Sequence, residues 1–224
     1  MLVTGIKSKP VYAPLQADVR GRYHLMLGLG VGAAPLLRVI AEMRSAAAQS
    51  LENTRVLYVP VAPDPGAALD AGATLDPGAT LDPGAAPQVE RFKGAAVSEV
   101  QAFPGTPALL ERFRVILGQS LMGTRLYVAG PESFIGLVMK IALEFNLNKD
   151  EIRAEECGTL ARRVYCIHCR ATTENVRTNI VSCVGCARWL LVRDHYSRRL
   201  AAYMGVMADA EAPGELPPLK EVFL

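Results

Sequence analysis

The sequence lacks a hydrophobic run long enough to cross a membrane, although half of its 224 residues are hydrophobic. Its most apolar stretch, Leu25–Leu37, is 13 residues long and is interrupted by three glycines and Pro35. A membrane-spanning helix needs about 20 consecutive apolar residues. We therefore expect no contact with a membrane, and we assign the apolar residues to a buried core.

The sequence also lacks an excess of one charge, because Lys+Arg 24 against Asp+Glu 22 gives a net charge of +2. A protein this close to neutrality has no strong bulk attraction to nucleic acid or to anionic membranes. The charge is unevenly spread, however, since residues 160–200 carry eight arginines against only Glu174 and Asp194. Such a basic segment fits either an arginine-rich face for an acidic partner protein or a nucleic-acid contact.

Cysteine is absent from the first 156 residues, and all five cysteines fall within residues 157–186. The N-terminal residues MLVTGIKSKP lack the apolar core of a secretory signal, so we expect a cytoplasmic protein with reduced thiols. In a reducing compartment, clustered cysteines indicate a metal site more often than disulfides.

Four of these cysteines form two C-x-x-C pairs that are separated by 13 residues: Cys166, Cys169, Cys183 and Cys186. Each pair presents two thiolates from one turn, and two pairs complete a tetrahedral four-sulfur site. Structural zinc in a ribbon is one candidate, and a single rubredoxin-like iron that carries one electron is the other. Arg170 and Ala187 directly follow the two pairs, where rubredoxins commonly have glycine, and this favours zinc.

The remaining cysteine and a nearby histidine fall outside this predicted ligand set. Cys157 precedes the first pair by nine residues and is interpreted as a small buried apolar residue. His195 is interpreted as a structural histidine. Asp194 suits a helix N-cap, and the apolar spacing that follows predicts a short amphipathic helix reaching Met207.

Over the first 158 residues, strand-like apolar runs alternate with amphipathic helical ones. The predicted strands are 23–29, 55–61, 97–103, 124–129 and 151–155, and the predicted helices are 35–50, 106–119 and 132–146. This alternation predicts an α/β domain with a parallel sheet of about five strands and flanking helices. A Pro/Gly/Ala-rich segment at 62–87, with a near-repeat of Asp-Pro-Gly-Ala, is expected to be an inserted loop.

Two domains are therefore expected. Residues 1–158 form the α/β domain. Residues 159–224 form a small metal-bound β ribbon with the short helix and an extended tail, because cysteine and arginine are concentrated there.

Two glycine-containing loops follow predicted strands of the first domain. They are the loop with Gly28, Gly30 and Gly32, and the pair Gly130–Pro131. Glycines at such positions let a pyrophosphate approach the backbone beside a helix N-terminus, but tight packing of a strand on a helix needs glycine as well.

The segments Leu25–Leu37 and Leu126–Phe134 (LYVAGPESF) resemble the nicotinamide-binding half of the ferredoxin reductase family. The resemblance implies that these glycines and Pro131 bind NAD(P)H. Ala129 stands where that family has a cysteine near the nicotinamide. Only about twenty residues precede the domain, so the flavin barrel that accompanies it in reductases is not expected in this chain.

The strings IKSKPVY, YCIHC, SCVGC and RDHYSRRLAAYMGV resemble the A-type subunit family of bacterial dimethylamine monooxygenases. The resemblance extends over the chain apart from the 62–87 insertion. It implies a subunit of an NAD(P)H-dependent, multi-component system that demethylates dimethylamine to methylamine and formaldehyde. The implied partners are a haem-type oxygenase component and a flavin/iron–sulfur reductase component.

No haem-ligand motif, flavin barrel or [2Fe–2S] loop is visible in the sequence, so haem, flavin and [2Fe–2S] are expected on the partners only. This chain is then an electron-relay or assembly subunit that is not catalytic alone. The alternative is a zinc-ribbon interaction or nucleic-acid-binding protein with a vestigial nucleotide fold.

Overall fold

The computed structural model describes residues 8–18, 20–46, 48–60 and 86–224, and the chain divides into two compact units. One unit runs from Tyr12 to Gly158, and the other comprises Thr159–Leu224 together with residues 8–11. Nearly all of the insertion predicted at 62–87 lies outside the described residues. Among the described helices, none is long and apolar enough to span a membrane.

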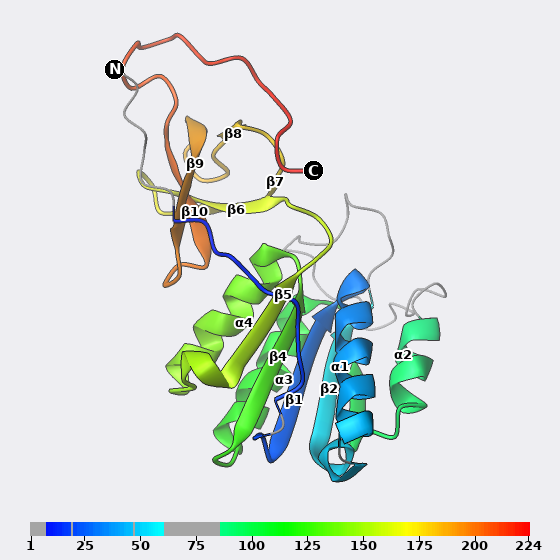
Figure 1. Ribbon diagram of the computed structural model, residues 1–224. Coiled ribbons are helices and arrows are strands. Elements are labelled where there is room, and N and C mark those ends of the chain that lie inside the picture. The colour runs from blue at the N-terminus through cyan, green and yellow to red at the C-terminus, as the bar shows by residue number, and fades with distance from the viewer. Residues whose placement is uncertain (1–7, 19, 47, 61–85) are drawn as a thin grey trace. The chain divides into compact units, whose positions relative to one another are not determined.

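The first unit is a parallel sheet with helices on both faces (Figure 1). Its strands are β1 (Tyr23–Leu29), β2 (Thr54–Val59), β3 (Glu99–Ala102), β4 (Thr124–Gly130) and β5 (Ile152–Glu156). Its helices are α1 (Ala33–Ala46), α2 (Ala86–Lys93), α3 (Thr106–Gly118) and α4 (Glu132–Glu144), with 3-10 turns η1 (Gly30–Gly32), η2 (Ala48–Asn53) and η4 (Lys149–Glu151). The order β3-β2-β1-β4-β5, parallel throughout, confirms the predicted α/β class and five-stranded sheet.

From Leu25 to Leu29 the central strand β1 is apolar, because it is buried on both faces. Leu25 and Leu27 belong to the apolar cluster that contains Phe113 of α3. Met26, which points to the opposite face, packs in a second cluster with Leu36 of α1. Parallel strands covered by crossover helices on both sides show this continuous hydrophobic pattern.

One predicted helix end and the predicted extent of the loop differ from the structure of this unit. The helix expected to run to residue 50 ends at Ala46, and the 3-10 turn η2 that follows places Leu51 in the buried cluster. Helix α2 was not predicted, and it begins within the segment expected to be a loop. Its fully buried Phe92 contacts the ring of Tyr58 edge-on, at 5.4 Å between centroids. This tertiary contact stabilises a helix that the local sequence pattern does not predict.

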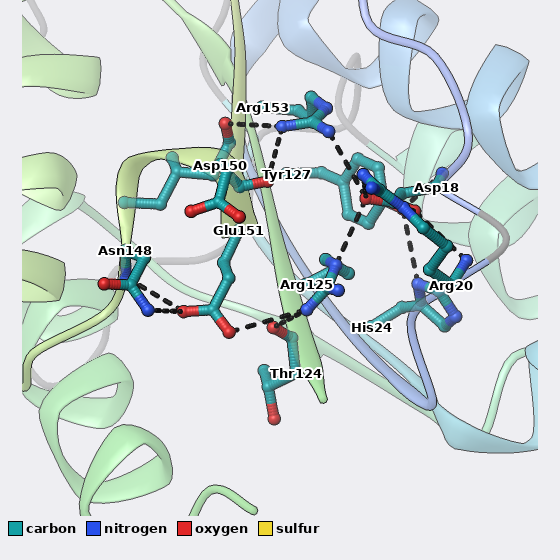
Figure 2. Close-up of polar contacts among 11 residues, drawn as sticks. Asp18, Arg20, His24, Thr124, Arg125, Tyr127, Asn148, Asp150, Glu151 and Arg153 are labelled. Atoms are coloured by element: carbon teal, nitrogen blue, oxygen red, sulfur yellow. Dashed lines mark hydrogen bonds and ion pairs between the residues drawn. The ribbon is translucent and has the colours of Figure 1, made fainter. Parts of the chain in front are cut away.

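A buried carboxylate, Asp18, fastens the segment before β1 to the sheet (Figure 2). It accepts hydrogen bonds from Arg20 at 3.0 Å, from Arg125 of β4 at 3.1 Å and from Arg153 of β5 at 3.3 Å. The hydrogen bond from Arg20 is the main cause that holds the pKa of Asp18 well below its usual range. The backbone N–H of Asp18 also donates to the hydroxyl of Tyr127, at 2.9 Å.

The second unit is a mixed five-stranded sheet with the order β7-β6-β10-β9-β8. Its strands are β6 (Arg162–Cys166), β7 (Thr172–Val176), β8 (Ile180–Ser182), β9 (Trp189–Ser197) and β10 (Ala202–Met207). Only β10 and β6 pair in parallel, and the other pairings are antiparallel.

The short helix predicted from Asp194 to Met207 is wrong, because this segment forms β9, a tight turn and β10. Tyr196 and Tyr203 are direct cross-strand partners, and their rings meet edge-on at 5.0 Å between centroids. The turn between the strands is closed by a hydrogen bond from the N–H of Leu200 to the carbonyl of Ser197, at 3.2 Å. The apolar spacing fits a helical face, but cross-strand aromatic packing stabilises the hairpin instead.

Arg162 anchors the C-terminal tail to this sheet. Its guanidinium lies 3.9 Å from the ring centroid of Tyr203 and 3.8 Å from that of Phe223, so it is held between the two rings. It also donates to Asp194 at 2.7 Å. A stacked and paired arginine of this kind ties the extended tail to the folded sheet.

Candidate metal centre

The four paired cysteines meet at one point of the second unit, where their Sγ atoms all lie within 4.8 Å of one another. Cys169 and Cys183 are 3.4 Å apart and Cys166 and Cys186 are 3.9 Å apart, measured between Sγ atoms. Disulfide bonds require about 2.05 Å. Sulfur atoms around a tetrahedral ion with bonds of about 2.3 Å lie about 3.8 Å apart. The cluster therefore fits one metal ion held by four thiolates.

The first C-x-x-C turn, residues 166–169, follows the end of β6. Cys166 donates its N–H to the carbonyl of Ala171 and accepts from the N–H of Arg170, each at 2.9 Å. The N–H of Cys169 points to Cys166 Sγ at 3.5 Å. These bonds fold the chain back on itself, so that both thiol groups of the turn face the same side.

The second turn, residues 183–186, follows β8 and repeats the two backbone hydrogen bonds of the first turn. Cys183 donates its N–H to the carbonyl of Arg188 and accepts from the N–H of Ala187, each at 2.9 Å. The N–H of Gly185 points to Cys183 Sγ at 3.4 Å. Two equivalent knuckles of this kind form the usual frame of a four-thiolate site.

The residue directly after each pair adopts a left-handed backbone, with φ of 69° at Arg170 and 57° at Ala187. This conformation favours glycine, since a Cβ at positive φ is strained. Arg170 and Ala187 thus adopt a conformation that favours glycine, at the position where rubredoxins commonly have glycine. Zinc and iron both accept four thiolates in this geometry, so the preference for zinc stays a prediction.

Gly185 is a residue that the sequence reasoning missed. A Cβ at this position would lie 2.6 Å from the Ala171 Cβ and 3.0 Å from Cys169 Sγ, so glycine is needed for the two knuckles to close on each other. The available signal was its place inside the second C-x-x-C pair, where it contacts the opposite turn.

Burial and hydrogen bonding differ among the four thiol groups. Cys166 and Cys183 are buried, Cys186 is half-buried and Cys169 is exposed. The backbone N–H of Arg188 lowers the pKa of Cys186 to about 6, which favours its thiolate at neutral pH. Metal binding requires deprotonated cysteines, so this hydrogen bond favours the ligand form of one of the four thiols.

Neither Cys157 nor His195 belongs to the sulfur cluster. Cys157 belongs to the first unit, where it packs half-buried against the apolar cluster beneath α1. Burial raises its pKa to about 11, which keeps this thiol protonated and unreactive. His195 is exposed on β9.

The predicted nucleotide loops lie next to each other at the carboxyl edge of the parallel sheet. Gly28 stands near the end of β1, opposite Ala129 of the neighbouring β4, and Gly130 and Pro131 follow directly. A Cβ on Gly28 would lie 2.8 Å from Leu36 Cδ1, and one on Gly32 would lie 2.1 Å from the carbonyl oxygen of Ala129. Close packing thus requires two of these glycines, and nucleotide binding stays a prediction.

The remaining loop glycine has a different role. Gly30 has a φ of 54°, in the left-handed region, and its carbonyl accepts a hydrogen bond of 2.6 Å from the hydroxyl of Tyr58. Burial raises the pKa of Tyr58 to about 12, so this hydroxyl remains a hydrogen-bond donor at neutral pH. A side chain of β2 therefore stabilises the turn between β1 and α1 through this hydrogen bond.

Models of one protein family match residues in both units of the chain. The N-terminal profile of the family described as "Dimethylamine monooxygenase subunit DmmA-like" matches residues 4–152, and its C-terminal profile matches residues 163–206. The chain belongs to this DmmA-like family. The C-terminal match includes all four cysteines of the candidate metal centre.

One curated relative matches half of the chain. The "Heme-dependent oxidative N-demethylase delta subunit" of Ectopseudomonas mendocina (strain ymp) is 33% identical over 111 residues, which is 50% of this chain. The match spans 63% of that relative, so somewhat less than two thirds of its length is represented. Its name describes one subunit of a haem-dependent oxidative N-demethylase.

Several solved structures are similar to the chain, at low sequence identity and low TM-score. The ferredoxin reductase of carbazole 1,9a-dioxygenase is 16% identical, with 65% of this chain and 34% of that chain covered and a TM-score of 0.38. The FAD/NAD-binding domain of nitric oxide dioxygenase from Vibrio cholerae O1 biovar El Tor is 16% identical, with 63% and 53% covered and a TM-score of 0.39. A hydrogenase C-terminal domain from Pyrococcus furiosus is 12% identical, with 66% and 99% covered and a TM-score of 0.39.

Proposed function

We propose that this chain is the metal-carrying accessory subunit of an NAD(P)H-dependent, multi-component monooxygenase that demethylates dimethylamine to methylamine and formaldehyde. Its family membership and its relative's name support a subunit of an oxidative N-demethylase. The observation that carries the proposal is the meeting of four Sγ atoms within 4.8 Å on two equivalent knuckles.

Cys166, Cys169, Cys183 and Cys186 would hold the ion. Iron at this site would carry one electron at a time between a reductase and an oxygenase component. Zinc would only stabilise the fold of the second unit. The chain's own contribution is the same in both cases. The backbone N–H groups of Cys169 and Gly185 stabilise negative charge on the first sulfur of each knuckle. Burial of Cys166 and Cys183 keeps water away from half of the ligand set.

Haem, flavin and [2Fe–2S] belong, on this proposal, to the partner subunits, which perform oxygen and hydride chemistry. The loops around Gly30 and Gly130 form the proposed NAD(P)H contact of this chain, at the carboxyl edge where α/β sheets bind ligands. A Gly30→Leu variant tests that contact, because the added side chain stands at a positive φ in the loop itself. A folded variant with unchanged nicotinamide affinity contradicts a role for the loop.

Reconstitution tests the proposed function as a whole. The proposed haem-type and flavin/iron–sulfur components are combined with NADPH, oxygen and dimethylamine, and formaldehyde is measured with and without this chain. We expect omission to lower the rate at least tenfold, and a Cys169→Ser/Cys183→Ser chain to restore less than a tenth of it. An undiminished rate in the absence of the chain contradicts the proposal.

A further inference from the structure

The tips of the two cysteine knuckles expose aliphatic side chains at equivalent positions. Ile167 directly follows the first cysteine of its knuckle and is 53% exposed, and Val184 directly follows the first cysteine of the other and is 71% exposed. Trp189, which begins β9 after the second knuckle, is 42% exposed. Large apolar side chains gathered beside a functional site indicate an interaction surface.

The same two turns carry the most accessible sulfur of the cluster. Cys169 is the exposed member of the cluster, and Gly185 of the opposite knuckle approaches its Sγ closely. The guanidinium of Arg188 lies 3.2 Å from Nδ1 of His168, which links the second knuckle to the first. We call residues 167–170 and 184–189 the knuckle face, since the two turns contact each other and together supply the four sulfur atoms.

The charge of the knuckle face has a single sign. Arg170 and Arg188 are both exposed there, and the two stretches contain no Asp or Glu. The acidic residues nearest in sequence are engaged elsewhere in the sheet, because Glu174 pairs with Arg163 at 2.9 Å and Asp194 pairs with Arg162. The face therefore combines exposed apolar and cationic side chains and contains no acidic one.

We propose that the knuckle face docks a partner protein whose own surface carries carboxylates around an apolar patch. Arginines with aliphatic anchors suit a protein interface, where apolar groups supply affinity and complementary charge supplies orientation and association rate. Single-stranded nucleic acid requires a row of cations and several stacking aromatics, and this face has two arginines and one tryptophan. The identity of the partner as a demethylase component rests on the proposed function.

The test measures the affinity of the full chain for each purified component, the haem-type and the flavin/iron–sulfur one, by biolayer interferometry at 50 and 300 mM salt. A 20-nucleotide single-stranded DNA serves as a third probe. We expect one component to bind at least tenfold more weakly to Arg170→Glu/Val184→Glu than to the unmodified chain. We also expect its binding to the unmodified chain to weaken at the higher salt.

The matched control is Arg198→Glu/Arg199→Glu, which alters the net charge more and lies in the turn between β9 and β10, outside the knuckle face. It should bind within twofold of the unmodified chain. Ile167→Glu, on the other knuckle, gives a second disruptive variant, and metal content is measured for every variant.

Three results overturn the docking proposal. They are unchanged affinity of the knuckle variants at full metal content, equal weakening by the control, and binding of the DNA but of neither component. A chain that fails to support formaldehyde formation yet binds a component through this face contradicts the proposed function alone, so the two failures are distinguishable.

Discussion

Cys169 Sγ lies 3.4 Å from Cys183 Sγ, although 13 residues separate the two cysteines in the sequence. The contact joins the exposed sulfur of the first knuckle to a buried sulfur of the second. Strands β7 and β8 occupy the intervening segment and form the two edges of the sheet. We therefore expect the folding of this unit to be coupled to metal binding.

Replacing Cys169 by serine removes one of four thiolates and leaves an incomplete ligand set. We expect the metal content of the purified Cys169→Ser chain to fall from about one ion to below about 0.2 per chain, because thiolate ligands carry the binding energy. Elemental analysis measures this directly. Cys157→Ser is the control and should retain the full metal content, since Cys157 packs in the other unit. Equal metal content in both variants would contradict the assigned ligand set.

Ala187 has a φ of 57°, so its side chain strains the second knuckle. We expect Ala187→Gly to raise the free energy of unfolding by about 0.5 kcal/mol, because relief of left-handed strain exceeds the entropy cost of glycine. Urea unfolding of the metal-loaded protein provides the measurement. Ala208→Gly, at a residue without positive φ, should lower the stability instead. A loss of stability in both variants would contradict the argument from strain.

Gly32 leaves no room for a side chain, because its Cβ would lie 2.1 Å from the backbone oxygen of Ala129. We expect Gly32→Ala to destabilise the first unit by about 2–3 kcal/mol through displacement of α1 or β4. Metal content should not change. Gly94→Ala is the control, since its nearest neighbouring atoms lie at 3.4 Å or beyond. Thermal unfolding followed by circular dichroism compares the two, and equal midpoints would show that the loop is not tightly packed.

The ion pairs of Asp18 predict a dependence of stability on pH. Because Arg20 and its neighbours lower the pKa of Asp18 in the folded state, folding favours the ionised form. This contribution is present above the unfolded pKa of about 4 and is lost progressively as the pH falls below it. We expect Asp18→Asn to lower the free energy of unfolding by about 1–2 kcal/mol at pH 7 and by less at pH 3. Urea unfolding at both pH values checks this, and a constant difference would contradict it.

The parallel sheet could be predicted because its strands are marked by local runs of apolar residues. Runs such as Leu25–Leu29 are apolar throughout, and they alternate with helical periodicity. The hairpin of β9 and β10 could not, since the spacing of Tyr196, Leu200 and Tyr203 suits a helix equally well. The choice between helix and hairpin depends on cross-strand pairing between residues that only the fold brings together. Helix α2 was missed for the same reason, as its anchor Phe92 is stabilised by a contact with β2.

The same distinction applies to the candidate metal centre. Its four cysteines are recognisable because C-x-x-C spacing is a local pattern. The need for Gly185 arises from the opposite knuckle, and the cationic knuckle face becomes apparent only when both turns are placed side by side. The Asp18 cluster likewise unites residues more than a hundred positions apart, which no local pattern reveals.

The most direct test of the account combines elemental analysis with the visible absorption spectrum of freshly purified full-length protein, before and after reduction with dithionite. The account predicts one zinc or iron ion per chain, lost in Cys169→Ser and retained in Cys157→Ser. Iron with absorption that bleaches on reduction assigns the chain to electron relay, and colourless zinc assigns it to assembly. A folded chain that contains no metal, or that keeps its metal without Cys169, would contradict the account.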